Sequence, residues 1–404
     1  MRPARAEGSA PQSPPPLEGR RILIVLGNLD LGGAERQALI LARHLADRQK
    51  AHVEVWGLGP VGRAAEHCDR AGIPWRSWPV RWTGGRTARI VSLLRFAIRL
   101  RKAAPEVLLP YTTIPNVACG VAARFSGARL CAWNQRDEGL SHPVATLERR
   151  AASRTRVFVA NSPGSASFLT RALGVDPALV RVIPNGVELA PAREDRASWR
   201  ERIGVGDATF LACMIANLHD NKDHETLLRA WRIALDRDPL SRGGILLLAG
   251  SPGNIADRLA SLHRALQLGD SVRFMGAVDD VAGLLGAVDL GLLTSRSEGC
   301  PNGVLECMAA GLPVGGTDIP GIRGALGMEG SALLAPPGDA EALAAKIALA
   351  AGDPALRATL GETNRRRAGS EFSPDRMCEA MTRLIVEEME TAQGGGRTPR
   401  GDSA

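Results

Sequence analysis

Two glutamates, Glu298 and Glu306, flank a segment whose composition is that of a loop turning into a helix. An apolar run over 288–293 comes before it, and Gly311 ends the helix expected over 304–310. A helix that starts beyond a strand offers backbone N–H groups and a positive dipole end to a phosphate. A carboxylate accepts two hydrogen bonds and so suits the paired hydroxyls of a sugar. The segment therefore predicts a nucleotide-sugar site. The ordinary alternative is a solvated loop glutamate and a glutamate that complements the helix dipole.

Two further loops follow expected strands. Gly32 and Gly33 come shortly after the apolar run 22–26, where glycine lets the backbone approach a ligand closely. Two adjacent glycines do not complete the G-x-G-x-x-G fingerprint of dinucleotide sites. Lys222 is one of four lysines beside 46 arginines, and it follows the strand expected over 210–216. A lysine placed there suits a diphosphate as a point charge, whereas an ordinary turn and a solvated lysine are the alternatives.

Length and composition favour a two-domain protein with substantial cores, since 404 residues is long for one domain and 45% are hydrophobic. No apolar run approaches 18 residues, so we expect no transmembrane helix. Residues 1–19 are Pro-rich without an apolar core, and 391–404 are rich in glycine and polar residues. We expect both segments to be disordered and the first not to be a secretion signal.

Seven cysteines without a C-x-x-C pair predict reduced thiols and a cytoplasmic protein.

Charge is distributed unevenly along the chain. Residues 1–190 hold 27 Lys or Arg and 14 Asp or Glu, whereas residues 191–404 hold 23 and 29. A basic first half suggests an anionic partner, either a phosphorylated acceptor or a membrane surface, and no recognition motif points to nucleic acid. The segment 86–102 predicts a basic amphipathic helix. We expect its apolar stripe to pack on a sheet, with contact to an anionic membrane as the alternative. The stripe consists of Ile90, Leu93, Leu94, Ala97 and Ile98.

Strand and helix patterns alternate in both halves of the chain, which predicts an α/β protein with two doubly wound, Rossmann-like domains. The turn around Asn185-Gly186 marks the expected boundary. We place an N-terminal, acceptor-side domain at 20–187 and a C-terminal, nucleotide-sugar-binding domain at 188–372. A final helix over 373–390 would follow. Ligands of such sheets bind beyond the carboxyl ends of the strands, so we expect the site in the cleft between the domains.

The order of these motifs resembles the retaining glycosyltransferases of family 4, which have the GT-B architecture of two facing domains. The resemblance covers about 21–390, and its specific part is the two-glutamate segment with Gly299 and Asn302-Gly303. The motifs are Gly32-Gly33-Ala34-Glu35, Asn185-Gly186-Val187, Asn217 with Lys222, Phe274 with Gly276, and Glu298 with Glu306.

The resemblance implies roles for individual residues. Glu306 would bind the ribose hydroxyls, Glu298 the hydroxyls of the donor sugar, and Lys222 the diphosphate. Glu298 and Lys222 are the candidate catalytic residues, and no protein nucleophile is assigned. The final helix would cross back onto the first domain. The other implied donor-binding residues act largely through their backbones and are Gly32, Gly33, Asn217, Phe274, Met275, Gly276, Gly299, Asn302, Gly303 and Val304.

The chain also departs from the family pattern. Many members have arginine where this chain has Asn217, and glycine where it has Asp223, which leaves Lys222 with more of the diphosphate charge. Many also have a histidine in the loop after the strand at 130–133. The polar residues in that loop are candidates for the acceptor side, and none is assigned as a base. They are Asn134, Gln135, Arg136 and Asp137.

The sequence thus predicts a retaining, metal-independent hexosyltransferase that moves a sugar from a nucleotide diphosphate sugar to an acceptor hydroxyl. A lipid-linked or polysaccharide precursor at the inner membrane face is the expected acceptor, and no cofactor is expected. Asp236-Arg237-Asp238 has the spacing of a metal-binding D-x-D motif, but we interpret it as a solvated helix end. The alternatives are another GT-B enzyme, such as a nucleotide-sugar epimerase, or a sugar-nucleotide-binding module without catalysis.

Overall fold

The chain divides into two compact units in the computed structural model, which describes residues 15–82, 85–139, 145–237 and 243–394. Unit 1 comprises residues 1–133, 150–157 and 378–404. Unit 2 comprises residues 134–149 and 158–377. The helix α15 (Pro374–Gly394) therefore begins in unit 2 and continues among the residues of unit 1.

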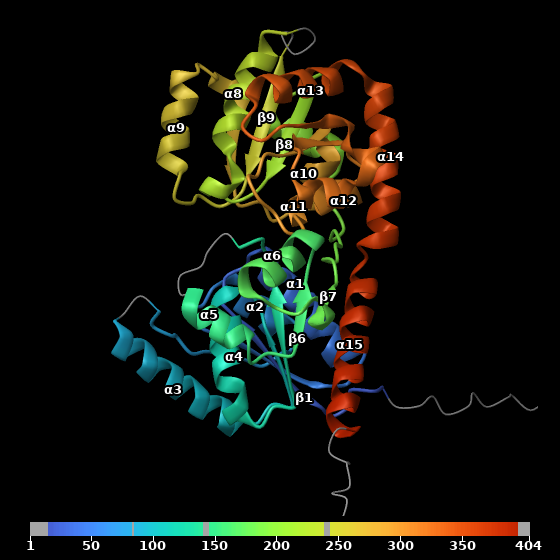
Figure 1. Cartoon of the computed structure of the whole chain (residues 1–404). Coiled ribbons are helices and arrows are strands. Elements are labelled where there is room, and N and C mark those ends of the chain that lie inside the picture. The colour runs from blue at the N-terminus through green and yellow to red at the C-terminus, as the bar shows by residue number, and fades with distance from the viewer. Residues whose placement is uncertain (1–14, 83–84, 140–144, 238–242, 395–404) are drawn as a thin grey trace, which may run out of the picture. The chain divides into compact units, whose positions relative to one another are not determined.

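The first sheet has seven strands in the order β3-β2-β1-β4-β5-β6-β7 (Figure 1). Strand β1 is central, and it pairs in parallel with both β2 and β4. The chain therefore moves outward in one direction from β1 and in the other direction from β4, which is the doubly wound arrangement. The strands are β1 (Arg21–Leu26), β2 (His52–Gly57), β3 (Trp75–Ser77), β4 (Val107–Pro110), β5 (Leu130–Gln135), β6 (Val157–Ala160) and β7 (Val180–Val182).

The second sheet repeats this topology with six parallel strands in the order β10-β9-β8-β11-β12-β13. Its central strands β8 and β11 are uninterrupted apolar runs, as expected for parallel strands covered on both faces. The strands are β8 (Phe210–Ile215), β9 (Gly244–Ala249), β10 (Val272–Gly276), β11 (Leu290–Leu293), β12 (Val314–Thr317) and β13 (Leu334–Ala335).

Helices connect successive strands in both sheets and bury apolar residues against them. Those between the strands of the first sheet are α1 (Gly33–Asp47), α2 (Arg63–Arg70), α3 (Arg86–Ala103), α4 (Thr113–Ser126), α5 (Ala145–Ala152) and α6 (Pro163–Leu173). The others before α15 are α7 (Arg196–Ile203), α8 (His224–Leu235), α9 (Ala256–Ala265), α10 (Val281–Ala287), α11 (Asn302–Ala309), α12 (Pro320–Gly330), α13 (Ala340–Gly352) and α14 (Pro354–Glu371).

The predicted fold class of two doubly wound α/β sheets is confirmed. Most predicted elements are found within two residues of their expected bounds, because long apolar runs and clear helix ends define them. The short strand Leu334–Ala335 was not predicted, because two residues show no alternation.

The two ends of the described chain differ from the sequence expectation. Residues 15–19 were assigned to a disordered segment, yet they form a turn in which Leu17 is fully buried. Residues 1–14 and 395–404 lie outside the described residues. At the other end, α15 continues to Gly394, beyond the expected end at residue 390.

The helix α3 corrects the expectation that its whole apolar stripe packs on the sheet. Phe96 and Leu100 are buried in the core that α3 shares with α4. Ile90, Leu94 and Ile98 remain 48%, 59% and 57% exposed. Leu93 and Ala97 of the predicted stripe do pack against this core. The other three stripe residues point away from it, because Phe96 and Leu100 lie on the opposite side of the helix from Leu94 and Ile98.

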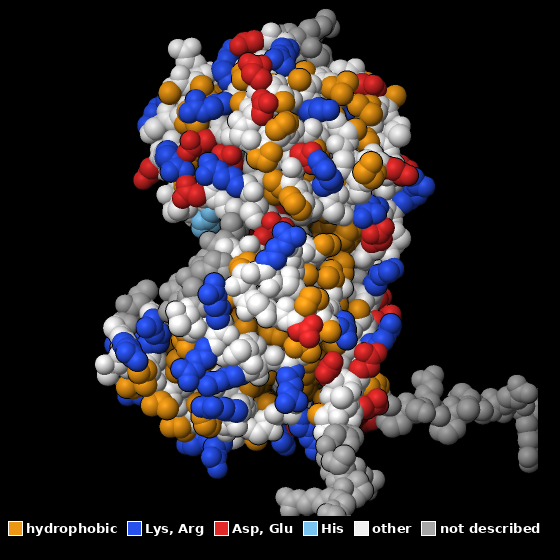
Figure 2. All heavy atoms as spheres, in the orientation of Figure 1, with side chains coloured by type: hydrophobic (Ala, Val, Ile, Leu, Met, Phe, Trp, Pro, Cys, Tyr) orange, Lys and Arg blue, Asp and Glu red, His pale blue; other side chains and the backbone are white. Residues whose placement is uncertain are grey.

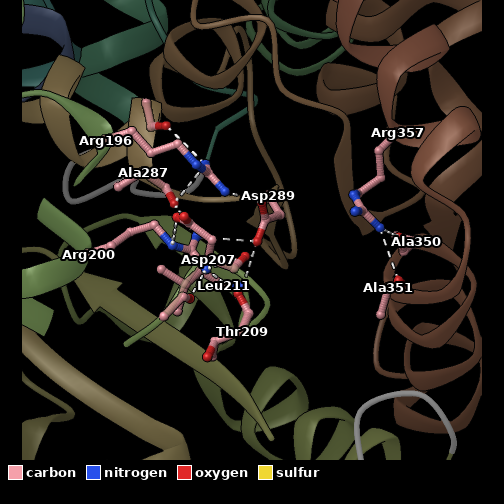
Figure 3. Close-up of polar contacts among 12 residues, drawn as sticks. Arg196, Arg200, Asp207, Thr209, Leu211, Ala287, Asp289, Ala350, Ala351 and Arg357 are labelled. Carbon is pink, nitrogen blue, oxygen red and sulfur yellow. Dashed lines mark hydrogen bonds and ion pairs between the residues drawn. The ribbon is translucent and has the colours of Figure 1, made fainter. Parts of the chain in front are cut away.

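A buried arginine, Arg200 of α7, joins this helix to the end of α10 and to the starts of the central strands β8 and β11 (Figure 3). Its guanidinium donates to the backbone carbonyls of Ala287 at 2.8 Å and of Thr209. The carboxylate of Asp289 lies 3.7 Å from Arg200 and accepts a hydrogen bond from the Leu211 amide at 2.9 Å. Burial lowers the pKa of Arg200, with the nearby Arg196 charge adding to the effect. Only a planar group with several donors satisfies these carbonyls together.

We therefore predict that Arg200→Lys lowers the free energy of unfolding by about 2–4 kcal/mol, because lysine cannot reach all of the carbonyls at once. Arg229→Lys, at an exposed position of α8, is the matched control and should change stability by less than about 0.5 kcal/mol. Urea unfolding of both variants measures the difference. Equal stability of the two variants would show that the Arg200 hydrogen bonds do not stabilise unit 2.

Candidate functional site

The candidate site lies where the second sheet divides, at the carboxyl ends of the adjacent strands β8 and β11. The chain leaves β8 through the loop 216–223 toward β9, and it leaves β11 through the loop 294–301 toward β12. Loops that diverge from neighbouring parallel strands in this way leave a crevice at the sheet edge, which is where ligands bind in such folds. The two predicted glutamates and Lys222 all belong to these loops or to the helix that follows.

Hydrogen bonds join the two loops into one structure. The Thr294 hydroxyl donates to the carbonyl oxygen of Lys222 at 3.0 Å. The Asn221 side-chain amide donates to the carbonyl oxygen of Ser297 at 3.0 Å, and the Arg296 amide donates to the Asn221 carbonyl at 2.8 Å. The backbone on both sides of the crevice is therefore held by groups that are satisfied locally, which preorganises the side chains that the loops carry.

Lys222 and Glu298 form an ion pair between the two loops. The Ser295 hydroxyl also donates to the Glu298 carboxylate at 2.6 Å. Ser295 is itself held by Thr317, whose hydroxyl donates to the Ser295 carbonyl at 2.6 Å. The predicted sugar-contacting carboxylate and the predicted diphosphate-binding ammonium are thus brought together beyond the carboxyl ends of β8 and β11.

The start of α11 lies close against the end of β8. A Cβ atom added to Gly303 would lie 2.6 Å from the carbonyl oxygen of Ile215, so only glycine fits at this approach. The N-cap residue Pro301 provides no side-chain hydrogen bond to the first turn. The N-terminal end of α11 thus directs amides and a positive dipole end toward the crevice without a side-chain cap of its own. Glu306 lies further along α11 and is buried.

Asn185 positions the turn before α11. The sequence analysis named it in the turn at the expected boundary and in the motif order of the resemblance, without a role of its own. Its side-chain amide donates to the Cys300 carbonyl at 2.8 Å and to the Asn302 side-chain oxygen at 2.7 Å. Asn185 is buried. Burial also raises the pKa of the Cys300 thiol to about 11, so this thiol is neutral at pH 7. The turn is therefore held from outside the two loops.

The backbone conformation at residue 223 explains why many family members have glycine where this chain has Asp223. Asp223 adopts φ +46°, the left-handed region in which glycine is unstrained and aspartate is one of the better tolerated residues. Its carboxylate accepts a hydrogen bond from the Thr226 hydroxyl at 2.9 Å and pairs with Arg296 at 3.3 Å. The next residue, His224, is fully buried. Burial, followed by the Lys222 charge, lowers the pKa of His224 to about 4, so Lys222 is the cation of this turn at pH 7.

The remaining donor candidates of unit 2 have separate roles in the structure. The Asn217 side chain accepts the Ser251 amide at 3.0 Å, so it fixes the neighbouring loop. Phe274 is exposed and its ring lies 5.8 Å from the His263 ring, whereas Met275 is partly buried. Gly276 has φ +65° and accepts a backbone hydrogen bond from Gly250 at 2.8 Å, which joins the ends of β9 and β10.

Gly32 and Gly33 belong to unit 1, whereas the other donor candidates belong to unit 2. Gly32 is the N-cap of α1, directly after the loop that leaves the central strand β1. The carboxylate of Glu35 lies against this helix start. Burial raises the pKa of Glu35, and hydrogen bonds from its own amide and from that of Gly32 oppose the rise. The helix start predicted as a phosphate site therefore already has an acidic side chain beside it.

Two of the acceptor-side candidates are structural. Asn134 and Gln135 at the end of β5 are buried, and Gln135 donates to the Asp137 carboxylate at 3.0 Å. That carboxylate also accepts the Gly139 amide at 2.8 Å, so Asp137 shapes its own turn. Arg136 is half-buried, and its carbonyl accepts a hydrogen bond from Asn161 at 3.1 Å.

Glu138 was missed by the sequence analysis. Its carboxylate accepts a hydrogen bond from the Ser297 hydroxyl at 3.2 Å, next to Glu298, and both residues belong to unit 2. Burial raises the pKa of Glu138, and the charges of Glu298 and Asp137 raise it further. The only sequence signal was its position directly after Asp137. A half-buried carboxylate with a raised pKa beside a crevice is a candidate proton acceptor.

Among the residues that the structure describes, no group of three or more His, Cys, Asp or Glu is arranged to hold a metal ion. Asp236 of the D-x-D sequence pairs with Arg232, and Asp238 lies outside the described residues. No helix among the described residues is both long enough and apolar enough to span a membrane.

Two family models match the chain in succession. Residues 31–191 match the model described as Glycosyltransferase Family 4. Residues 209–353 match the model described as Glycosyl transferases group 1. These ranges contain the motifs on which the resemblance was based. The chain is a glycosyltransferase of the family 4 type.

Curated relatives of this glycosyltransferase are similar at low identity. A D-inositol 3-phosphate glycosyltransferase of Salinispora arenicola is 30% identical over 59% of the chain and 56% of its own length. Two others with that name match 59% and 52% of their lengths, so the chain spans little more than half of these relatives. A 2-deoxystreptamine N-acetyl-D-glucosaminyltransferase of Streptomyces fradiae is 27% identical over 78% of the chain and 81% of its own length.

Solved structures with the same fold cover most of this glycosyltransferase. Anabaena Alr3699/HepE, in complex with UDP-glucose, superposes with a TM-score of 0.78 and 20% identity over 91% of the chain and all of that protein. A sucrose-phosphate synthase of Thermosynechococcus elongatus has a TM-score of 0.75 and 21% identity, over 92% of the chain and all of that protein. At these identities the likeness establishes the two-domain GT-B fold.

The contact of Gly303 with β8 gives a direct test of the site's geometry. We predict that Gly303→Ala lowers the free energy of unfolding by about 1–3 kcal/mol and speeds amide exchange in α11, because the new methyl group forces α11 away from Ile215. Gly324→Ala in α12 is the matched control, since its added Cβ would meet nothing within 4 Å. That change should leave stability equal or raise it by up to about 1 kcal/mol. Equal effects at both positions would contradict the close approach.

Proposed function

We propose that this protein transfers a sugar from a nucleotide diphosphate sugar to an acceptor hydroxyl, with retention of the anomeric configuration. The observation that carries the proposal is the meeting of Lys222, Glu298 and the start of α11 at the division of the second sheet. A lone cation, a hydroxyl-binding carboxylate and an uncapped helix start suit the three parts of such a donor. We take a UDP-sugar as the first donor to test, because the Anabaena neighbour is solved with UDP-glucose.

On this proposal the diphosphate competes with Glu298 for the Lys222 ammonium. The two residues pair directly in the structure, and Ser295 keeps a second hydrogen bond to Glu298. Two phosphates carry more charge than one carboxylate, so the ammonium would shift its contact to the diphosphate. Glu298 would stay oriented by Ser295 and accept hydrogen bonds from the sugar hydroxyls. Lys222 and the amides of α11 would then stabilise the charge that develops on the leaving diphosphate.

Glu306 would hold the ribose of the donor nucleotide. It lies in α11 beyond the first turn, and it is buried, so hydroxyls that reach it leave water. Hydrogen bonds to a buried charged group contribute more to affinity than those at an exposed one. Orientation of the donor would come from contacts at its two sides, which brings the anomeric carbon to a fixed position.

For the acceptor, the proposal names a class of molecule and a candidate proton acceptor. An acceptor hydroxyl must approach the donor sugar and lose its proton, and Glu138 beside Ser297 has the raised pKa that suits a proton acceptor. A lipid-linked or polysaccharide precursor is the proposed acceptor class, on the grounds of the basic first half of the chain and the family resemblance. The reaction as proposed needs no metal ion, since Lys222 and α11 supply the positive charge.

We predict that a UDP-sugar raises the melting temperature of the protein in a panel of UDP-, GDP- and ADP-sugars, and that the best ligand turns over only when an acceptor is added. EDTA should leave the turnover unchanged. Conversion of the donor without acceptor would instead indicate an epimerase, and stabilisation without any turnover a binding module. A folded protein that none of these donors stabilises would overturn the proposal.

The two glutamates should separate binding from turnover. We predict that Glu306→Ala weakens nucleotide affinity about 10- to 100-fold, because it removes a charged hydrogen-bond acceptor. Glu298→Ala should reduce kcat and the discrimination between sugars more than it reduces nucleotide affinity. Glu329→Ala, at an exposed position of α12, is the control. Calorimetric binding of UDP and steady-state kinetics give the two readouts, and unchanged values in both site variants would refute the assigned roles.

A further inference from the structure

A basic surface lies on unit 1. The helix α3 and the segment after β3 line a groove of about 680 Å³. Its polar lining includes three arginines and two hydroxyl groups, with one aromatic ring. These residues are Arg81, Arg95, Arg99, Thr87, Ser92 and Trp78. Nothing in the proposed transfer reaction uses this groove.

The charge of the groove is not neutralised within the described chain. α3 contains six Lys or Arg residues and no Asp or Glu. Among the residues that the structure describes, no carboxylate pairs with Arg81, Arg95 or Arg99. Arg99 lies over the Trp78 ring at 4.0 Å, which holds its guanidinium in place while leaving its N–H groups as donors. Several arginines that share one groove suit phosphate groups, which accept hydrogen bonds from the guanidinium fork.

An exposed apolar ridge runs along α3 beside the groove. Ile90, Leu94 and Ile98 are spaced by four residues, so they form one row on the helix. Val91, which is 40% exposed, lies between this row and the groove that it also lines. In Figure 2, orange and blue side chains gather together over α3. A soluble phosphate compound would leave the ridge in water, whereas a phospholipid surface offers both acyl chains and phosphates.

We propose that α3 docks on an anionic phospholipid bilayer, with Ile90, Leu94 and Ile98 below the headgroups and the arginines of the groove on headgroup phosphates. Each feature alone gives weak attachment, and a bilayer surface allows the apolar and charged contributions to add. The docking is independent of the donor site in unit 2. A failure of the proposed transfer would therefore leave the docking proposal unchanged, and docking is measured without a nucleotide sugar.

Flotation of the full chain with lipid vesicles tests this docking. The protein should float with vesicles of phosphatidylcholine mixed with phosphatidylglycerol and remain unbound with phosphatidylcholine alone. A groove variant, Arg81→Gln with Arg95→Gln and Arg99→Gln, should bind the mixed vesicles at least about tenfold more weakly. A ridge variant, Ile90→Gln with Leu94→Gln and Ile98→Gln, should lose a similar factor and release from vesicles at lower salt.

The control variant removes the same charge elsewhere, with Arg229→Gln, Arg366→Gln and Arg383→Gln at exposed positions. It should bind within about twofold of the unmodified protein, and urea unfolding should show that all three variants remain folded. An equal loss in the control would mean that net charge alone causes binding, and would overturn the proposal. So would the absence of binding to the mixed vesicles. Size-exclusion chromatography in which only the ridge variant turns from dimer to monomer would assign the ridge to a second copy instead.

Discussion

The close packing of α11 on the end of β8 is the constraint on which the candidate site depends. The helix start can lie there only because Gly303 has no side chain to meet the Ile215 carbonyl. Asn185 holds the same turn from the other side through Cys300 and Asn302. With α11 fixed, the loop that carries Glu298 has little freedom, and Glu306 follows at a set distance along the helix. The positions of both glutamates are thus consequences of one backbone contact.

The electrostatics of the site follow from burial as much as from pairing. Burial, followed by the charge of the neighbouring Lys222, lowers the pKa of His224 to about 4, so His224 is neutral at pH 7. On the other side, Glu138 has its pKa raised by burial and by the charge of Glu298. A raised pKa makes a carboxylate a stronger proton acceptor, which is the property that the proposed role of Glu138 requires.

The sequence was sufficient for the fold and for placing the candidate donor residues Lys222, Glu298 and Glu306 after strand ends, because both rest on local patterns. Apolar runs followed by glycine-containing loops mark the strand ends of a doubly wound sheet, and Lys222, Glu298 and Glu306 all follow such ends. Asn185 and Glu138 could not be found this way, since their partners lie more than a hundred residues away along the chain. The exposure of Ile90, Leu94 and Ile98 on α3 fits only the alternative given for this helix, because periodicity does not tell which of two apolar faces a neighbouring helix will cover.

The ion pair between Lys222 and Glu298 has a consequence for the choice of ligand. Any anion that approaches Lys222 must replace a carboxylate that already satisfies it. A ligand with a single negative charge gains little from this exchange, whereas one that brings two adjacent phosphates gains a second interaction with the start of α11. On the proposed function, the Lys222–Glu298 pair therefore disfavours the binding of abundant metabolites that carry a single negative charge. The selectivity of the site for charge would then reside in a contact that forms without any ligand.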